Sequence, residues 1–131
     1  MYVTDMENGV VSHRLEHLSC FLPGVLALGA KRLDLPEDLR DLHRLAAHGL
    51  AYTCTMMYLD QESGLSPEYV QFTKGLKWVD EIQRWDKEGR VGVVPGTSEP
   101  PPERNYTLRD YDVGMPDSWY LRPEVCLQKP V

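Results

Sequence analysis

The chain has 131 residues, of which 42% are hydrophobic and 26% are charged, a composition typical of one soluble globular domain. Its net charge of −6 at pH 7 disfavours nucleic acid or an anionic membrane as the main partner. No apolar run approaches the roughly 18–20 residues that span a bilayer, and the first residues lack the basic and apolar regions of a signal peptide.

The first predicted elements are a hairpin and a short helix. Valines flank Asn8 and Gly9, a pair that favours a tight β-turn. Residues 17–30 form the most apolar run of the chain, and the spacing of their leucines predicts a helix that is buried on most sides. Pro23 suits only a first turn, so the helix should start near residues 20–22 and end near 29–31.

Residues 36–59 carry the clearest helical pattern. Apolar side chains recur in steps of three and four, and acidic residues crowd the first turn, where the helix dipole favours them. Gly49 lies in the middle of this helix and costs about 1 kcal/mol relative to alanine, which suggests a close contact with another helix.

The second half of the chain is less regular. Residues 60–67 read as a loop, and residues 69–78 as a short strand followed by a helical turn. Residues 80–117 are rich in proline, glycine and charge, which predicts a long exposed loop or insertion. Pro123 could open a further helix, but residues 125–131 form a divergent tail in which Pro130 prevents a long continuation.

Three motifs together resemble class I α-1,2-mannosidases, glycoside hydrolase family 47. The first is His-Leu-Ser-Cys-Phe-Leu-Pro-Gly-Val-Leu-Ala-Leu-Gly at residues 17–29, the second Gly-Leu-Ser-Pro-Glu at 64–68, and the third Tyr-Leu-Arg-Pro-Glu at 120–124. All three occur in the family's order. The resemblance implies an all-α fold, part of an (α/α) barrel of paired helices with short β-hairpins, of which residues 1–131 would be an incomplete internal piece. A truncated gene model would explain the divergent tail.

The resemblance also implies roles for particular residues. Glu124 matches the general base of an inverting glycosidase, and Arg122 matches a residue that binds and orients the sugar. His17, Leu18 and Glu68 match substrate-site positions of the family. Leu18 and Phe21 could form an apolar wall for the sugar, with packing in the core as the alternative for both. The residues alone also allow simpler roles for the others. Glu124 could be an acidic residue favoured at a helix start by the helix dipole, and Arg122 could be a surface arginine. His17 could cap a helix, and Glu68 could be an ordinary loop acid.

By the same resemblance, Cys20 and Cys54 form a disulfide, which would stabilise the fold by roughly 3–4 kcal/mol. Without the resemblance, the cysteines would suggest free buried thiols. Cys126 has no partner assigned in either case. The cysteine spacing excludes a zinc site of the usual type.

The implied cofactor is calcium, held by a threonine that lies outside this chain, and no residue here is assigned as a metal ligand. Asn105 begins a glycosylation sequon, which together with a disulfide favours the secretory pathway of the endoplasmic reticulum, the Golgi or the cell exterior. A membrane anchor of the parent would lie outside this segment.

The implied function is hydrolysis of terminal α-1,2-linked mannose from high-mannose N-glycans with inversion. The general acid lies upstream in the family, so the isolated chain should be inactive. Two alternatives stay open. One is a non-hydrolytic, mannosidase-like glycan-binding protein of glycoprotein quality control. The other is a structural helical hairpin without a site.

Overall fold

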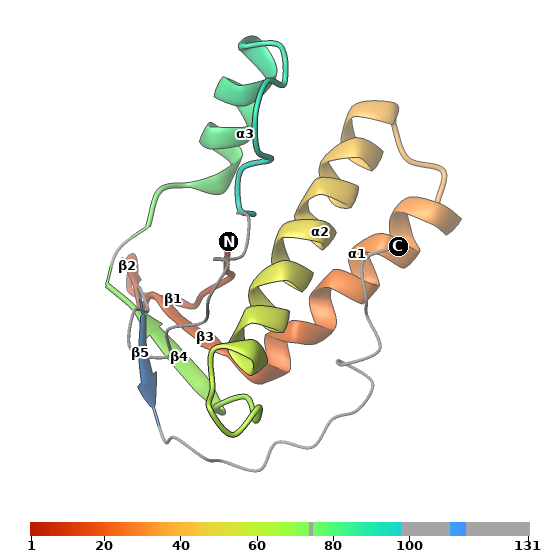
Figure 1. Ribbon diagram of the computed structural model, residues 1–131. Coiled ribbons are helices and arrows are strands. Elements are labelled where there is room, and N and C mark those ends of the chain that lie inside the picture. The colour runs from red at the N-terminus through yellow and green to blue at the C-terminus, as the bar shows by residue number, and fades with distance from the viewer. Residues whose placement is uncertain (74, 98–110, 115–131) are drawn as a thin grey trace.

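The computed structural model of the chain describes residues 1–73, 75–97 and 111–114, and Figure 1 labels its helices and strands. Two packed helices form one side of the molecule, and short strands lie beside the C-terminal end of the longer helix (Figure 1). Helices account for about half of the described residues. The all-α prediction is therefore confirmed only in its helical part, because the chain also contains a three-stranded sheet beside the predicted hairpin.

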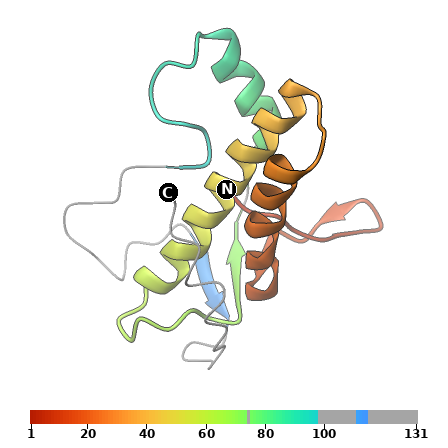
Figure 2. The ribbon, with the colours of Figure 1, turned by 90° about the vertical axis from the view of Figure 1, so that its right-hand side faces the viewer.

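The helical pair consists of α1 (Leu22–Arg32) and α2 (Glu37–Leu59), preceded by the 3-10 helix η1 (His17–Phe21). A short connection between α1 and α2 makes them antiparallel neighbours that lie side by side in both views (Figures 1 and 2). Pro23 lies in the first turn of α1, as expected. The predicted extents of both helices are thus confirmed to within a residue or two.

The outer face of this pair is apolar. Phe21, Val25 and Leu28 recur in steps of four and three, so they share one side of η1 and α1, and each is about half exposed. A stripe of this kind is the pattern of a helix that packs on a further helix. The rest of α1 packs on α2, with Pro23 and Ala30 buried.

The strands form two separate structures. β1 (Met6–Glu7) pairs with β2 (Val10–Val11) as the predicted hairpin, with Asn8 and Gly9 at positive φ, and this hairpin extends away from the helices (Figure 2). β3 (Arg14–Glu16), β4 (Tyr69–Phe72) and β5 (Tyr111–Gly114) form an antiparallel sheet with β4 in the centre. The predicted strand near residue 69 is therefore confirmed.

The core lies where this sheet meets the helices. Its buried members come from β3, η1, α2 and β4, and they are Leu15, Cys20, Cys54, Met57 and Val70. Tyr2, Val3, Phe72 and Tyr111 pack around them, with the rings of Tyr2 and Phe72 stacked at 4.0 Å between centroids. The core therefore joins segments that are distant in the sequence, and it holds η1 against the end of α2.

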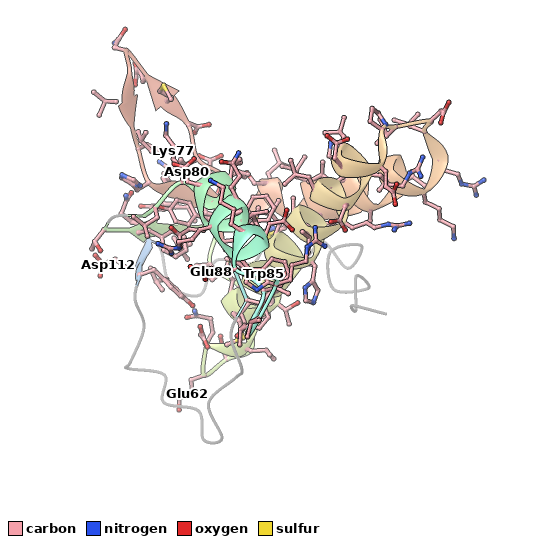
Figure 3. The ribbon with its side chains drawn as sticks, turned by 90° about the horizontal axis from the view of Figure 1, so that it is seen from above. Glu62, Lys77, Asp80, Trp85, Glu88 and Asp112 are labelled. Carbon is pink, nitrogen blue, oxygen red and sulfur yellow. A yellow bond between two sulfur atoms is a disulfide. The ribbon has the colours of Figure 1, made fainter. Side chains whose placement is uncertain are left out.

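The expected loop over residues 80–117 is wrong at its start, because α3 (Trp78–Lys87) is a helix. Figure 3 shows α3 from above, with Lys77 and Asp80 near its start and Trp85 and Glu88 near its end. Its first turn is acidic and its last turn basic, as the helix dipole favours. β5 also lies within the expected loop, whereas residues 98–110 and 115–117 lie outside the described part.

Arg90 ties the end of α3 to α2. Its guanidinium donates hydrogen bonds of 2.6 Å to Asp86, one turn earlier, and of 2.6 Å to Asp41 on α2. Asp86 and, to a smaller extent, Asp41 accept these bonds and stabilise the charged guanidinium, which raises the pKa of Arg90. The buried Ile82 and a hydrogen bond of 2.7 Å from Nε1 of Trp78 to the carbonyl oxygen of Pro95 also hold α3 in place.

The sequence suggested that Gly49 contacts another helix. The space beside Gly49 is instead filled by Met1. A Cβ on Gly49 would lie 2.8 Å from the sulfur of Met1 and 3.7 Å from the carbonyl oxygen of Gly96. The amino group of Met1 in turn donates to Thr53 of α2 over 3.0 Å. The space beside Gly49 therefore receives the first residue of the chain.

Gly96 lies on the other side of Met1, next to Trp78, and its replacement should destabilise the protein. Its φ of +92° disfavours any side chain, and a Cβ would lie 2.7 Å from Cβ of Met1 and 3.0 Å from Nε1 of Trp78. We expect Gly96→Ala to lower the free energy of unfolding by about 2–4 kcal/mol, the sum of backbone strain and overpacking, in urea titrations. Gly92→Ala is the matched control, since Gly92 has φ +86° but nothing within 4 Å of the added Cβ. Equal losses in the two variants would contradict the packing part.

Candidate functional site

The sheet brings two of the three sequence motifs together. β3 runs directly into η1, and β4 follows directly on the loop that contains the second motif. Glu16 pairs with Tyr69, and the ladder continues one residue further, where the backbone N–H of His17 donates to the carbonyl oxygen of Glu68 over 2.8 Å. His17 and Glu68, predicted for one site, are therefore adjacent although they lie 51 positions apart in the sequence.

The imidazole of His17 is held inside the protein. The residue is 1% exposed, and its Nε2 lies 2.5 Å from the hydroxyl oxygen of Tyr58 on α2. The two rings meet edge to face, with centroids 5.5 Å apart and planes at 71°. The N-cap position of η1 is Glu16, and no side chain caps this helix. The simpler reading of His17 as a helix cap is therefore wrong.

Leu18 and Phe21 lie on the outside of the same segment. They are 53% and 48% exposed, so neither packs in the core of the described part of the chain. Two apolar side chains are thus exposed on the same 3-10 helix that carries the buried imidazole. Their arrangement is compatible with an apolar wall for a sugar ring, which stays a prediction.

Glu68 is exposed and ends the loop between α2 and β4, in which the two preceding residues are buried. Ser66 and Pro67, directly before it, are buried, and the Ser66 hydroxyl donates to the Pro67 carbonyl oxygen over 3.1 Å. Gly64 has φ +71°, a conformation that the turn of this loop needs and glycine adopts readily. The motif therefore fixes the backbone beside His17 and leaves the Glu68 carboxylate in solvent.

The predicted disulfide is confirmed. Sγ of Cys20 and Sγ of Cys54 are 2.04 Å apart, and the two Cα atoms are separated by 5.8 Å, inside the usual range of about 4.4–6.8 Å. The bond joins η1 to α2. The predicted contact between the helix that begins near residue 20 and the end of the second helix is confirmed with it.

Tyr58 is the site residue that sequence reasoning missed. In an antiparallel pair, a residue three places before one cysteine faces a residue three or four places after the other. His17 precedes Cys20 by three residues and Tyr58 follows Cys54 by four. The pairing of the two cysteines therefore contained the signal, because it sets His17 opposite Tyr58.

Several predicted residues lie outside the described part of the chain. Arg122, Glu124, the sequon residue Asn105 and the tail at residues 125–131 are among them, so their roles and their approach to His17 stay predictions. Among residues 1–73, 75–97 and 111–114 no group of three or more His, Cys, Asp or Glu could hold a metal ion. The expected calcium, with its threonine ligand outside this chain, stays a prediction. No helix in those ranges is long and apolar enough to cross a membrane.

Comparisons with known proteins agree with the motifs. The model of glycosyl hydrolase family 47 matches residues 1–126. The endoplasmic reticulum mannosyl-oligosaccharide 1,2-alpha-mannosidase of Rattus norvegicus is 44% identical over 71 residues, 54% of this chain and 10% of the relative. Its Homo sapiens counterpart is 42% identical over 71 residues, 54% of this chain and 9% of the relative. The chain thus spans about a tenth of the length of these curated relatives.

Proposed function

Since the chain belongs to glycosyl hydrolase family 47, we propose that it contributes part of the catalytic domain of an enzyme that removes terminal α-1,2-linked mannose from high-mannose N-glycans. The observation that carries this proposal is the adjacency of His17 and Glu68. Two motifs from different parts of the chain meet at one corner, as the residues of a single binding site must.

The proposed chemistry is inversion at the anomeric carbon. The Glu124 carboxylate takes a proton from a water molecule, the water oxygen bonds to the anomeric carbon, and the bond to the leaving oxygen breaks as a general acid outside this chain protonates it. Arg122 would orient the sugar or the carboxylate through its fixed donors. His17 would hold a hydroxyl group, with Leu18 as an apolar wall and Glu68 as a polar neighbour. Calcium would be held outside the described residues, and the steps assigned to this chain do not involve it.

The proposed architecture is a segment of an (α/α) barrel. The support is the apolar stripe of Phe21, Val25 and Leu28, which faces away from α2 and would pack on a neighbouring helix of the barrel. Burying three such side chains is worth several kcal/mol in total. The isolated chain would then lack both the general acid and much of the water-excluding pocket, so we propose that it is inactive alone.

The proposed location is the lumen of the secretory pathway. Both relatives described above are named for the endoplasmic reticulum. A disulfide that joins η1 to α2 fits an oxidising compartment, where such bonds persist.

A chimera tests this function. Residues 1–126 would replace the matching segment of a full-length family 47 relative, with the unaltered relative as positive control. We expect the chimera to release mannose from an α-1,2-linked mannose disaccharide, with β-mannose as the first product seen by NMR, and the isolated 131-residue chain to release none. Release by the isolated chain, or α-mannose as the first product, would contradict the proposal. A folded chimera that binds the disaccharide without cleaving it would favour the glycan-binding alternative.

A further inference from the structure

We propose that Tyr58 is a positioning residue that orients the imidazole of His17 through its hydroxyl group. The geometry belongs to the described residues of this chain, whereas its consequence for sugar binding rests on the proposed function. Tyr58 lies in none of the three motifs that point to the family, and its only marker is its place one helical turn after Cys54.

The contact with Tyr58 sets the orientation of the His17 ring. A distance of 2.5 Å between Oη and Nε2 is that of a short hydrogen bond, and the ring is buried, so water does not compete for that bond. Turning the imidazole by 180° about its last torsion would exchange nitrogen and carbon positions and break the bond. The edge-to-face contact with the Tyr58 ring restricts smaller rotations. Tyr58 therefore selects one orientation of the ring. The tautomer then follows from the direction of the bond, in which the hydroxyl either donates to Nε2 or accepts from Nε2–H.

Two further constraints keep Tyr58 within reach. The disulfide between Cys20 and Cys54 joins the same two segments about one turn away. The backbone of His17 is bonded to Glu68, so η1 cannot move along α2 without breaking the sheet. His17 is thus held at its backbone by β4 and at its ring by α2, which are the conditions for a preorganised binding group.

The first test is NMR of the 131-residue chain with 15N-labelled histidine. We expect the ring nitrogens of His17 to report one dominant tautomer in the wild-type chain, and a shift toward a mixture of tautomers in Tyr58→Phe. Tyr69→Phe is the matched control: it also removes one hydroxyl from a half-buried ring, but that ring lies under the guanidinium of Arg14, 4.0 Å from centroid to Cζ. Unchanged His17 signals in Tyr58→Phe would overturn the proposal.

A second variant guards against misfolding. Site-specific incorporation of 3-fluorotyrosine at position 58 keeps the hydroxyl and the ring but makes the hydroxyl more acidic. We expect the His17 ring nitrogens to shift in this protein while the backbone spectrum stays that of the wild type. A response confined to the backbone signals, without a change at the His17 ring, would count against the proposal.

The consequence for sugar binding is tested in the chimera. If His17 holds the sugar equally in the ground state and the transition state, Tyr58→Phe should raise KM about 3- to 10-fold with little change in kcat, the size of one weakened hydrogen bond. Shifted His17 signals with an unchanged KM would support the role of Tyr58 and overturn the role of His17 in the proposed function. The two failures are therefore distinguishable.

Discussion

Replacing Glu124 with glutamine in the chimera should lower kcat by at least ~10²-fold. The amide keeps the shape of the side chain but cannot accept a proton from water, so the attacking water would keep its proton in the transition state. Binding of the mannose disaccharide should change far less, because the ground state does not require that proton transfer. Initial rates and an isothermal titration on the same protein preparation measure both quantities.

The matched control for this variant is Glu62→Gln. Glu62 is an exposed glutamate in the loop after α2, away from the labelled residues of α3 (Figure 3). The same loss of one carboxylate there should leave kcat unchanged. Near-normal turnover in Glu124→Gln would remove Glu124 from the mechanism, even though the family assignment would stand on the motifs and the match over residues 1–126.

The two long helices and the first hairpin could be predicted because their signals are local. The apolar steps of three and four over residues 36–59 and the Asn8-Gly9 turn involve only neighbours in the sequence. The sheet of β3, β4 and β5 could not be found in this way, since it pairs residues near 15, 70 and 113. The local pattern of a three- or four-residue strand does not indicate which other strand it pairs with.

The helix α3 was missed for a different reason. Its ten residues contain one buried residue, Ile82, and prolines and glycines follow the helix closely. The hydrogen bond from Arg90 to Asp41, which joins α3 to α2, crosses 49 positions of the sequence. Trp78, Ile82 and Trp85 recur in steps of four and three, so a local helical pattern was present. The proline, glycine and charge content of the whole segment outweighed it in the prediction.

Some residues of the candidate site could be predicted from the sequence, and others could not. His17, Leu18 and Glu68 could be proposed from motifs, but only the sheet explains why His17 and Glu68 meet. Tyr58 belongs to no motif, yet it follows from the pairing of Cys20 with Cys54 once the helices are known to be antiparallel. A disulfide predicted from a family resemblance can therefore be used to place side chains one turn away on each partner.

The disulfide itself carries the second large prediction. It closes a loop across a sequence separation of 34, for which the chain-entropy estimate is roughly 3–4 kcal/mol of stabilisation. We expect the double variant Cys20→Ala and Cys54→Ala to lose at least that free energy of unfolding in urea titrations. Both sites are buried core positions, so lost sulfur volume adds about 1 kcal/mol or more.

Two controls distinguish the effect of breaking the disulfide bond from the effect of removing its sulfur atoms. All variants would carry Cys126→Ser, which should leave stability unchanged and prevents exchange with the third cysteine. Reducing the otherwise wild-type protein breaks the bond but keeps both sulfur atoms, so the difference between reduced protein and double alanine variant measures the packing loss. Because the bond also holds η1 on α2, reduction should broaden the ring signals of His17 before the protein unfolds globally. A loss below 1 kcal/mol on reduction would show that the sheet and core alone hold η1 in place.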